Sequence, residues 1–125
     1  MKPRWLSKQA LLLLHEESLA EHGGARGLRD EGLLESALAR PLNLAAYGTA
    51  QLAACYGVGL AKNRAFVDGN KRAAFLAVGL LLALNRKRLV ASQLDATQTM
   101  LAVAAGETDE AGCAVWIGGH LRSRA

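Results

Sequence analysis

Residues 73–84 read AAFLAVGLLLAL, twelve positions without one charged side chain. The segment is too short to cross a membrane as a helix, which takes about 20 residues. A helix that is apolar on every side is typical of the buried middle of a bundle. We therefore predict a buried central helix over about residues 70–85, and we expect no membrane partner.

The flanking sequence predicts five further helices. Side chains suited to cap helix starts precede four of them: Ser7, Asp30, Ser92 (in a capping box with Asp95) and Thr108. The predicted helices run over about 7–22, 30–40, 49–62, 92–105 and 108–120. No segment alternates polar and apolar residues in the way that a half-buried strand does. The fold class predicted is all-α, a six-helix bundle around the fourth helix.

Three details of this bundle are also predicted. The first helix is so apolar over Leu11–Leu14 that we expect it to pack on two sides. The fifth helix should bury one face, and the last should bury its apolar cluster. The residues assigned to these two surfaces are Leu94, Thr97, Leu101 and Ala104, and Val115, Trp116 and Ile117, respectively. The tail, residues 122–125, is expected to fray.

Composition places the chain in a broad class. Its 125 residues fit one domain, 1–125, and 51% of them are hydrophobic. The formal charge of +4 suits an anionic partner without identifying one. Cys55 and Cys113 stand in no metal-binding spacing, and we expect both to be buried and reduced. No signal-peptide pattern follows the basic start, so we expect a cytoplasmic protein.

The stretch KNRAFVDG, residues 62–69, leads into the central helix. Lys71 and Arg72 occupy the first turn of that helix, where carboxylates are usual because this end carries partial positive charge. The amides of the first turn also lack partners within the helix. With Arg64 upstream and Gly69 allowing close approach, these residues predict a phosphate site. The alternative is that Lys71 and Arg72 are merely solvated.

Asp68 is the one carboxylate beside these cations. Mg²⁺ commonly binds through one or two carboxylates together with phosphate oxygens, so Asp68 is a candidate metal ligand. Asn70 could cap the helix or bond a phosphate oxygen. The alternative for Asp68 is that it caps the helix and binds nothing.

Beyond this local chemistry, the chain resembles the Fic/Doc (Fido) family and its Doc, or death-on-curing, toxin branch. The branch has the pattern His-x-Phe-x-Asp/Asn-x-Asn-Lys-Arg, and residues 64–72 here read RAFVDGNKR. The segments 27–41, 56–63 and 101–110 are also similar to family segments. The resemblance covers nearly the whole chain and implies a helical Fido fold.

The resemblance also implies an activity. Adenylyl-transferring Fic enzymes usually carry Gly where this chain has Lys71, and the Lys of Doc-type proteins implies the reversed nucleotide orientation. The implied reaction is then phosphoryl transfer from ATP to a threonine of translation elongation factor Tu, which blocks translation. Asp68 would coordinate Mg²⁺, and Asn70, Lys71 and Arg72 would hold the triphosphate. Phe66 would anchor the loop, and Leu42–Gly48 would form a target-docking flap.

One departure from the pattern matters. Arg64 stands where the family has the His that acts as general base, and a guanidinium stays protonated in proteins. The chain is therefore expected to be catalytically inactive. Arg64 is either engineered or selected because an active toxin kills its producer, or it marks a natural inactive copy. His15, His22 and His120 offer no evident replacement, and we expect all three to be partly exposed or at the core edge.

The resemblance further implies an antitoxin, whose C-terminal helical segment would lie in a groove of the bundle. Two alternative functions are a Fic-like protein adenylyltransferase, disfavoured by Lys71, and a non-catalytic, antitoxin-binding regulator. A nucleic-acid binder using residues 86–88 and the C-terminal arginines ranks low, because the basic clusters are short and aromatics few. We thus expect contact with nucleic acid only through the antitoxin.

Overall fold

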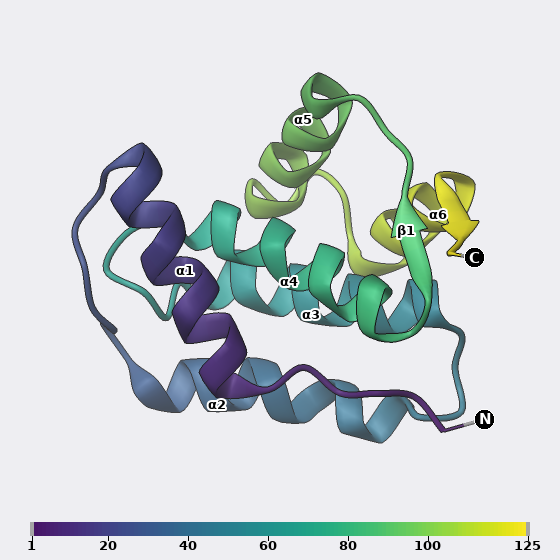
Figure 1. The fold of residues 1–125 in the computed structure, drawn as a ribbon, viewed down its shortest axis with the longest axis horizontal. Coiled ribbons are helices and arrows are strands. Elements are labelled where there is room, and N and C mark those ends of the chain that lie inside the picture. Colours follow the sequence, from purple (N-terminus) through teal and green to yellow (C-terminus); the bar gives the residue numbers. More distant parts are fainter. Residues whose placement is uncertain (1, 125) are drawn as a thin grey trace.

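The computed structural model describes residues 2–124, and within this range the chain forms six α-helices and one small sheet (Figure 1). The helices are α1 (Lys8–His22), α2 (Glu31–Ala39), α3 (Thr49–Asn63), α4 (Asn70–Leu84), α5 (Gln93–Ala104) and α6 (Glu110–Gly119). A short 3-10 helix, η1 (Arg40–Leu44), follows α2, and the strands are β1 (Lys87–Leu89) and β2 (Leu121–Ser123). The predicted all-α, six-helix bundle is confirmed.

Side-chain caps fix four of the helix starts. Ser7, Asp30 and Ser92 each accept a hydrogen bond from the amide three residues later, at 2.9, 3.0 and 3.1 Å. Such a bond satisfies one of the amides that the first turn leaves without a partner. The last helix is capped by Asp109 rather than by the predicted Thr108, because it begins one residue later than expected.

The centre of the bundle is α3, which packs on α2, α4, α5 and α6. Its residues 52–58 are buried without interruption. Gly57 brings α4 close, since a Cβ atom there would lie 2.8 Å from the Val78 side chain. The prediction that α4 is buried on every side is wrong, because Phe75 is 39% exposed. α4 instead packs between α1, α3 and α5 and keeps one outer face.

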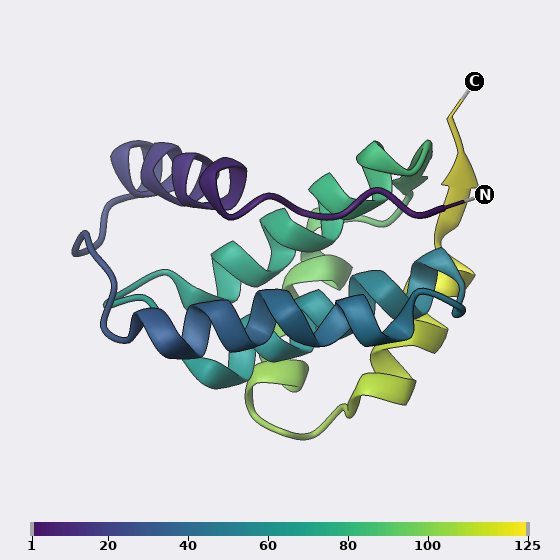
Figure 2. The same ribbon diagram turned by 90° about the horizontal axis from the view of Figure 1, so that it is seen from below.

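α1 lies along the edge of the bundle against α4 (Figure 2). It buries a single stripe, formed by Leu11, His15, Ser18 and Leu19. These positions recur with the helical period, so they share one face. The predicted packing on two sides is wrong, because Leu13 is 58% exposed.

α5 also buries a face other than the predicted one. Its buried residues are Ala96, Met100 and Val103, whereas Leu94 and Leu101 are 67% and 49% exposed. Both sets have helical spacing, and packing against α3 and α4 selects between them. In α6, Ile117 is buried as predicted, but Val115 is 77% exposed.

β1 and β2 form an antiparallel two-stranded ribbon in which Arg88 faces Arg122. Residues 122 and 123 are therefore ordered in a strand rather than frayed, and Ala125 lies outside the described residues. No sequence pattern indicated this ribbon, because three-residue strands are too short to show alternation. Cys55 and Cys113 are buried free thiols, as expected. No helix in residues 2–124 has both the length and the apolar character that a membrane crossing requires.

Candidate active site

The connection between α3 and α4, residues 64–69, is called the motif loop. It turns the chain sharply, with Arg64 and Gly69 in left-handed backbone conformations at φ 51° and 74°. A side chain on residue 69 would be strained there and would also meet the His15 ring at 3.2 Å. Phe66 is buried at 2% exposure and anchors the loop in the core, as predicted.

Asn70 fastens the motif loop to the start of α4. Its side-chain oxygen accepts a hydrogen bond from the Phe66 amide at 2.9 Å, and its side-chain nitrogen donates to the Phe66 carbonyl at 3.0 Å. The Asn70 side chain thus links the start of α4 to the backbone of Phe66 in the motif loop. One amide hydrogen remains for a ligand, so contact between Asn70 and a phosphate stays a prediction.

His15, on α1, contacts the motif loop through a hydrogen bond and a ring stack. Its Nε2 lies 2.8 Å from the carbonyl oxygen of Asp68, and its ring stacks on Phe66 with centroids 3.7 Å apart. A carbonyl only accepts, so Nε2 carries a hydrogen and donates it. The sequence alone indicated no role for His15 at the site, because 53 residues separate it from Asp68. Only the placement of α1 on α4 brings the two together.

The connection between α1 and α2 borders the motif loop on its other side. The amide of Val67 donates to the Gly27 carbonyl at 3.0 Å, and the amide of Arg29 donates to the Ala65 carbonyl at 2.7 Å. The segment Leu42–Gly48, expected to form a flap, precedes α3 and so lies at the opposite end of it. The 15 residues of α3 put about 21 Å between the two ends. The role of 42–48 as a target-docking flap stays a prediction.

Arg29 is a further site residue that sequence reasoning missed. Its guanidinium donates to the carbonyls of Arg64 and Asn63, at 2.8 and 3.2 Å, at the C-terminal end of α3. A cation is favourable there, because the helix dipole makes this end negative. The signal in the sequence was weak, since a single arginine in a loop is usually solvated.

These segments enclose a cavity of about 690 Å³. The polar residues that line it are Arg29, Arg64, Asp68, Asn70, Lys71 and Arg72, together with Gly69. We call it the cation pocket, because four cationic residues and one carboxylate line it. The N-cap residue of α4 is Gly69, which has no side chain to cap the helix, so the first-turn amides are not covered by a capping group. The structure therefore brings all the sequence-predicted site residues to one cavity, and Asp68 does not cap the helix.

Asp68 is ionised in this setting. Hydrogen bonds from the amides of Ala25 and Gly69, at 3.2 and 2.9 Å, lower the pKa of its carboxyl, and Arg72 lowers it further. The carboxylate is exposed and keeps free lone pairs, so its chemistry fits a Mg²⁺ ligand. Residues 2–124 hold no group of three or more side chains that could bind a metal alone. A cation here would need phosphate oxygens as its other ligands.

Comparison with known proteins identifies the family. Residues 5–82 match the Fic/DOC family. The chain belongs to the Fic/Doc family. It is 41% identical over 75 residues to "Toxin Doc" of Mycolicibacterium smegmatis, covering 55% of this chain and 57% of that relative. It is 31% identical over 86 residues to "Protein kinase doc" of Escherichia phage P1, covering 66% of this chain and 68% of the phage protein. The match to the mycobacterial relative thus spans little more than half of it.

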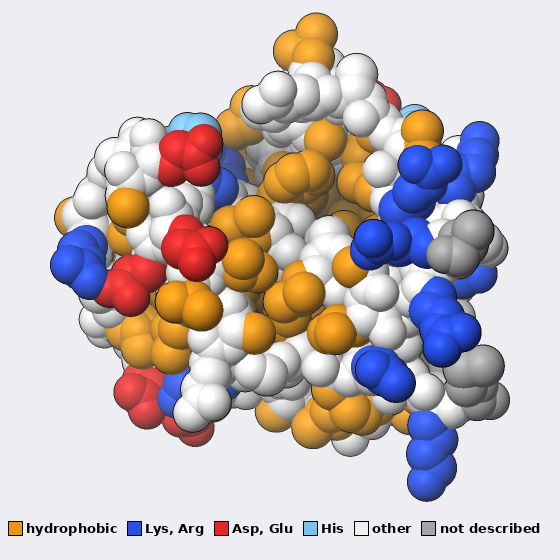
Figure 3. Space-filling model, viewed as in Figure 1, with side chains coloured by type: hydrophobic (Ala, Val, Ile, Leu, Met, Phe, Trp, Pro, Cys, Tyr) orange, Lys and Arg blue, Asp and Glu red, His pale blue; other side chains and the backbone are white. Residues whose placement is uncertain are grey.

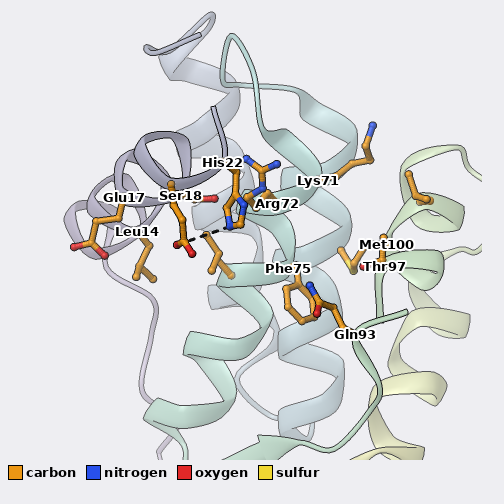
Figure 4. A pocket seen from close by; sticks show the side chains of 13 residues that line it. Leu14, Glu17, Ser18, His22, Lys71, Arg72, Phe75, Gln93, Thr97 and Met100 are labelled. Carbon is orange, nitrogen blue, oxygen red and sulfur yellow. Dashed lines mark ion pairs between the residues drawn. The ribbon is translucent and has the colours of Figure 1, made fainter. Parts of the chain in front are cut away.

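Histidines are absent from the lining of the cation pocket in this Fic/Doc chain, as far as residues 2–124 show. His15 is 4% exposed and contacts the motif loop, so of the two alternatives expected for it, partly exposed or at the core edge, it is not partly exposed. His22 does not line the cation pocket, and its Nε2 lies 3.8 Å from a carboxylate oxygen of Glu21 (Figure 4). His120 is the C-cap residue of α6, and its Nε2 lies 3.4 Å from a carboxylate oxygen of Asp95. No imidazole is therefore placed to act on a ligand in the pocket.

A second cavity of this Fic/Doc chain, about 550 Å³, lies between α1, α4 and α5. Its apolar floor is visible as a hollow between these helices in Figure 3. Phe75 and Leu101, two of the exposed residues that the helix predictions misplaced, belong to its lining, as do Lys71 and Arg72. We call it the groove. The two cavities meet at Lys71 and Arg72, which line both.

Proposed function

We propose that the cation pocket binds the triphosphate of ATP together with Mg²⁺, and that the chain is the toxin-family component of a toxin–antitoxin module. The observation that carries the proposal is the uncapped first turn of α4, which faces a cavity with four cationic residues and one ionised carboxylate. Free amides, the helix dipole and full positive charges all favour a phosphate at that position.

Each residue then has a role in the proposed site. Arg72 would grip phosphate oxygens with two parallel hydrogen bonds, and Lys71 would act as a point charge. Asp68 would hold the metal ion, which would neutralise charge on the transferred group. Asn70 and His15 would keep the loop in position through their bonds to Phe66 and Asp68. Gly69 would let the phosphates approach the backbone.

The proposed reaction of active relatives is transfer of a phosphoryl group to a threonine of translation elongation factor Tu. In this chain Arg64 cannot take the proton from an acceptor hydroxyl, and none of the described histidines lines the pocket. Loss of a positioned general base typically lowers the rate by about 10²–10⁴. We therefore propose that this chain binds nucleotide but is catalytically inactive, or nearly so, in phosphoryl transfer.

Calorimetric titration of the purified chain with ATP and Mg²⁺ tests the binding step. We expect binding by the chain and by an Arg64→His variant, and weaker binding by at least tenfold for Arg72→Ala. Lys8→Ala, which removes a cation remote from the pocket, is the matched control and should bind normally. Absence of ATP binding in both the chain and Arg64→His would overturn the proposal.

Labelled nucleotide tests the reaction. The Arg64→His variant, incubated with elongation factor Tu, should transfer label from the γ position of ATP and not from the α position. Transfer from the α position alone would support the adenylyltransferase alternative, in spite of Lys71. Equal toxicity in cells of the unchanged chain and the Arg64→His variant would contradict the role assigned to position 64.

The groove is the proposed seat of the antitoxin's C-terminal helical segment. Its floor is apolar, as a docking site for an amphipathic helix requires. The Ser18 hydroxyl lines it and is buried with no hydrogen-bond partner among the described residues. Such a group costs about 1–3 kcal/mol, which a bound segment could offset by supplying a partner. A peptide of the antitoxin's C-terminal residues should lose affinity for Leu101→Glu but keep it for Val115→Glu, an exposed apolar position outside the groove.

A non-catalytic regulator is the second candidate function, and Arg64 favours it. A chain with an intact groove and an inert pocket would still bind antitoxin without acting on a target. Normal antitoxin binding by this chain, combined with no phosphoryl transfer even by Arg64→His, would favour this candidate over the kinase.

A further inference from the structure

Three basic segments that lie far apart in the sequence meet at one end of the molecule. β1 and β2 pair with Arg88 opposite Arg122, and the amide of Arg124 donates to the carbonyl of Arg86 at 2.9 Å. The N-terminal segment joins them, because the amide of Arg4 donates to the Asn85 side chain at 2.9 Å. We call the resulting surface the basic ribbon. Its cations are Arg4, Arg86, Lys87, Arg88, Arg122 and Arg124.

The basic ribbon accounts for the positive charge of the whole chain. Removing its six cations from the 15 Lys and Arg leaves nine, fewer than the 11 Asp and Glu. Among residues 2–124, none of the six forms an ion pair with a carboxylate. In Figure 3 most of the Lys and Arg side chains in view gather at the right edge of the molecule, while the carboxylates lie mainly over the left one.

The ribbon turns its arginines outward. Residues that face each other across an antiparallel pair point to the same side, and neighbours along a strand point to opposite sides. Leu89 and Leu121 face each other and pack against the core. Arg88 and Arg122, one position along each strand, therefore project together into solvent, and both are exposed. Like charges placed directly opposite destabilise a sheet, so folding alone does not account for this pair.

We propose that the basic ribbon binds the phosphate backbone of double-stranded DNA without regard to sequence. The ribbon residues line neither of the two cavities described above. A basic stripe on one face of a domain is typical of a nucleic-acid-binding surface. A two-stranded ribbon fits the major groove of B-form DNA, whereas the major groove of duplex RNA is too narrow for side chains to read.

This proposal revises the expectation that nucleic acid is reached only through an antitoxin. That expectation weighed residues 86–88 and the C-terminal arginines as separate short clusters. The structure pairs these segments in one ribbon, so their positive charges lie together. No sequence pattern indicated this pairing. The proposal does not depend on the cation pocket, and it stands or falls separately from nucleotide binding.

Fluorescence anisotropy with a labelled duplex of arbitrary sequence, about two helical turns long, tests the proposal, using the purified chain between about 50 and 200 mM salt. Affinity should fall steeply with salt, and the slope of log K against log[salt] should approach about −5 if each of the six cations meets a phosphate. The double variant Arg88→Gln/Arg122→Gln should reduce the magnitude of that slope by about 2.

The matched control is Arg26→Gln/Lys62→Gln, which removes the same charge from positions outside the ribbon and both cavities. Its slope should equal that of the unchanged chain. Thermal unfolding should show that the ribbon variant is folded and no less stable, since it loses a like-charge pair. Three results would overturn the proposal: no binding at the lowest salt concentration, an equal loss in the control, or equal binding of duplex RNA or polyglutamate.

Discussion

The two positively charged regions of this molecule differ in how their cations are held. In the cation pocket, Arg29 donates to helix-end carbonyls, and the loop that carries Arg64 is fastened by Asn70 and His15. In the basic ribbon, Arg88 and Arg122 face each other across two short strands, and none of the six cations pairs with a carboxylate among the described residues. Cations that line a cavity and are held by hydrogen bonds suit one compact anion. Cations that stand on an open surface suit an extended anion. The arrangement of charge, rather than its amount, therefore separates the two proposed ligands.

Replacing Phe66 by Ala should have the largest effect, because it tests whether the pocket is anchored in the core. Phe66 is 2% exposed and stacks on His15, and loss of a buried Phe typically costs about 3–5 kcal/mol. Denaturant unfolding measures the change. Val67→Ala, at the exposed neighbouring position, should cost far less. Similar losses for the two variants would show that the motif loop is not braced by the core.

The second prediction concerns the bond from His15 to the loop. His15→Phe keeps an aromatic ring against Phe66 but removes the donor to the part-buried Asp68 carbonyl, so the cost should lie at or below the about 1–3 kcal/mol of a fully buried unsatisfied acceptor. His15→Gln retains a donor and should recover part of that stability. ATP affinity should follow the same order, because the bond positions the turn before α4. Equal behaviour of the Phe and Gln variants would mean that only packing matters at this position.

Acid should lower the free energy of unfolding by protonating Asp68. The folded state holds the pKa of this carboxyl below its ordinary value of 3.8, so it takes up the proton less readily than the unfolded chain does. The stability that Asp68 contributes is complete above that value and is lost as the pH falls through the lower, folded-state pKa. Asp68→Asn should flatten the acid side of the stability profile. The matched variant Glu107→Gln, at an exposed turn, should leave the profile unchanged.

The smallest effect should come from the two arginines in left-handed backbone. Arg64 and Arg86 have φ values of 51° and 61°, a conformation that costs a non-glycine residue roughly 1–2 kcal/mol. Arg86→Gly should raise the free energy of unfolding by less than about 1 kcal/mol, because the entropy of glycine offsets part of the relief. It should also reduce the DNA salt slope by about 1 and leave ATP binding intact.

Arg64→Gly is the counterpart at the other end of the molecule. It should give a similar change in stability but weaken ATP binding while leaving the DNA salt slope unchanged. If either glycine variant altered both ligands, the two charged regions would not be independent.

Local chemistry explains most of what was predicted correctly from the sequence. A cap acts within one turn, so Ser7, Asp30 and Ser92 located their helices without any tertiary information. The candidate residues of the motif loop and the first turn of α4 are also neighbours in the chain, so their convergence needed no knowledge of the fold.

The failures arise where tertiary packing decides between local options. Apolar residues stand on both faces of α5, and only its contacts with α3 and α4 bury Met100 rather than Leu101. His15 reaches the motif loop from another helix, and Arg88 meets Arg122 from a distant part of the chain. Neither pairing can be predicted from the residue spacing within one segment. The two partners are far apart in the sequence, and only the folded chain brings them together.

Both ends of the described chain are fastened beside Asn85 and Arg86, through Arg4 and Arg124 (Figure 1). A domain fused at either terminus would consequently shield the basic ribbon and leave the entrance to the cation pocket open. An acidic fusion partner at that position would compete with DNA for the basic ribbon. A fusion at a terminus could therefore block DNA binding and leave nucleotide binding unchanged.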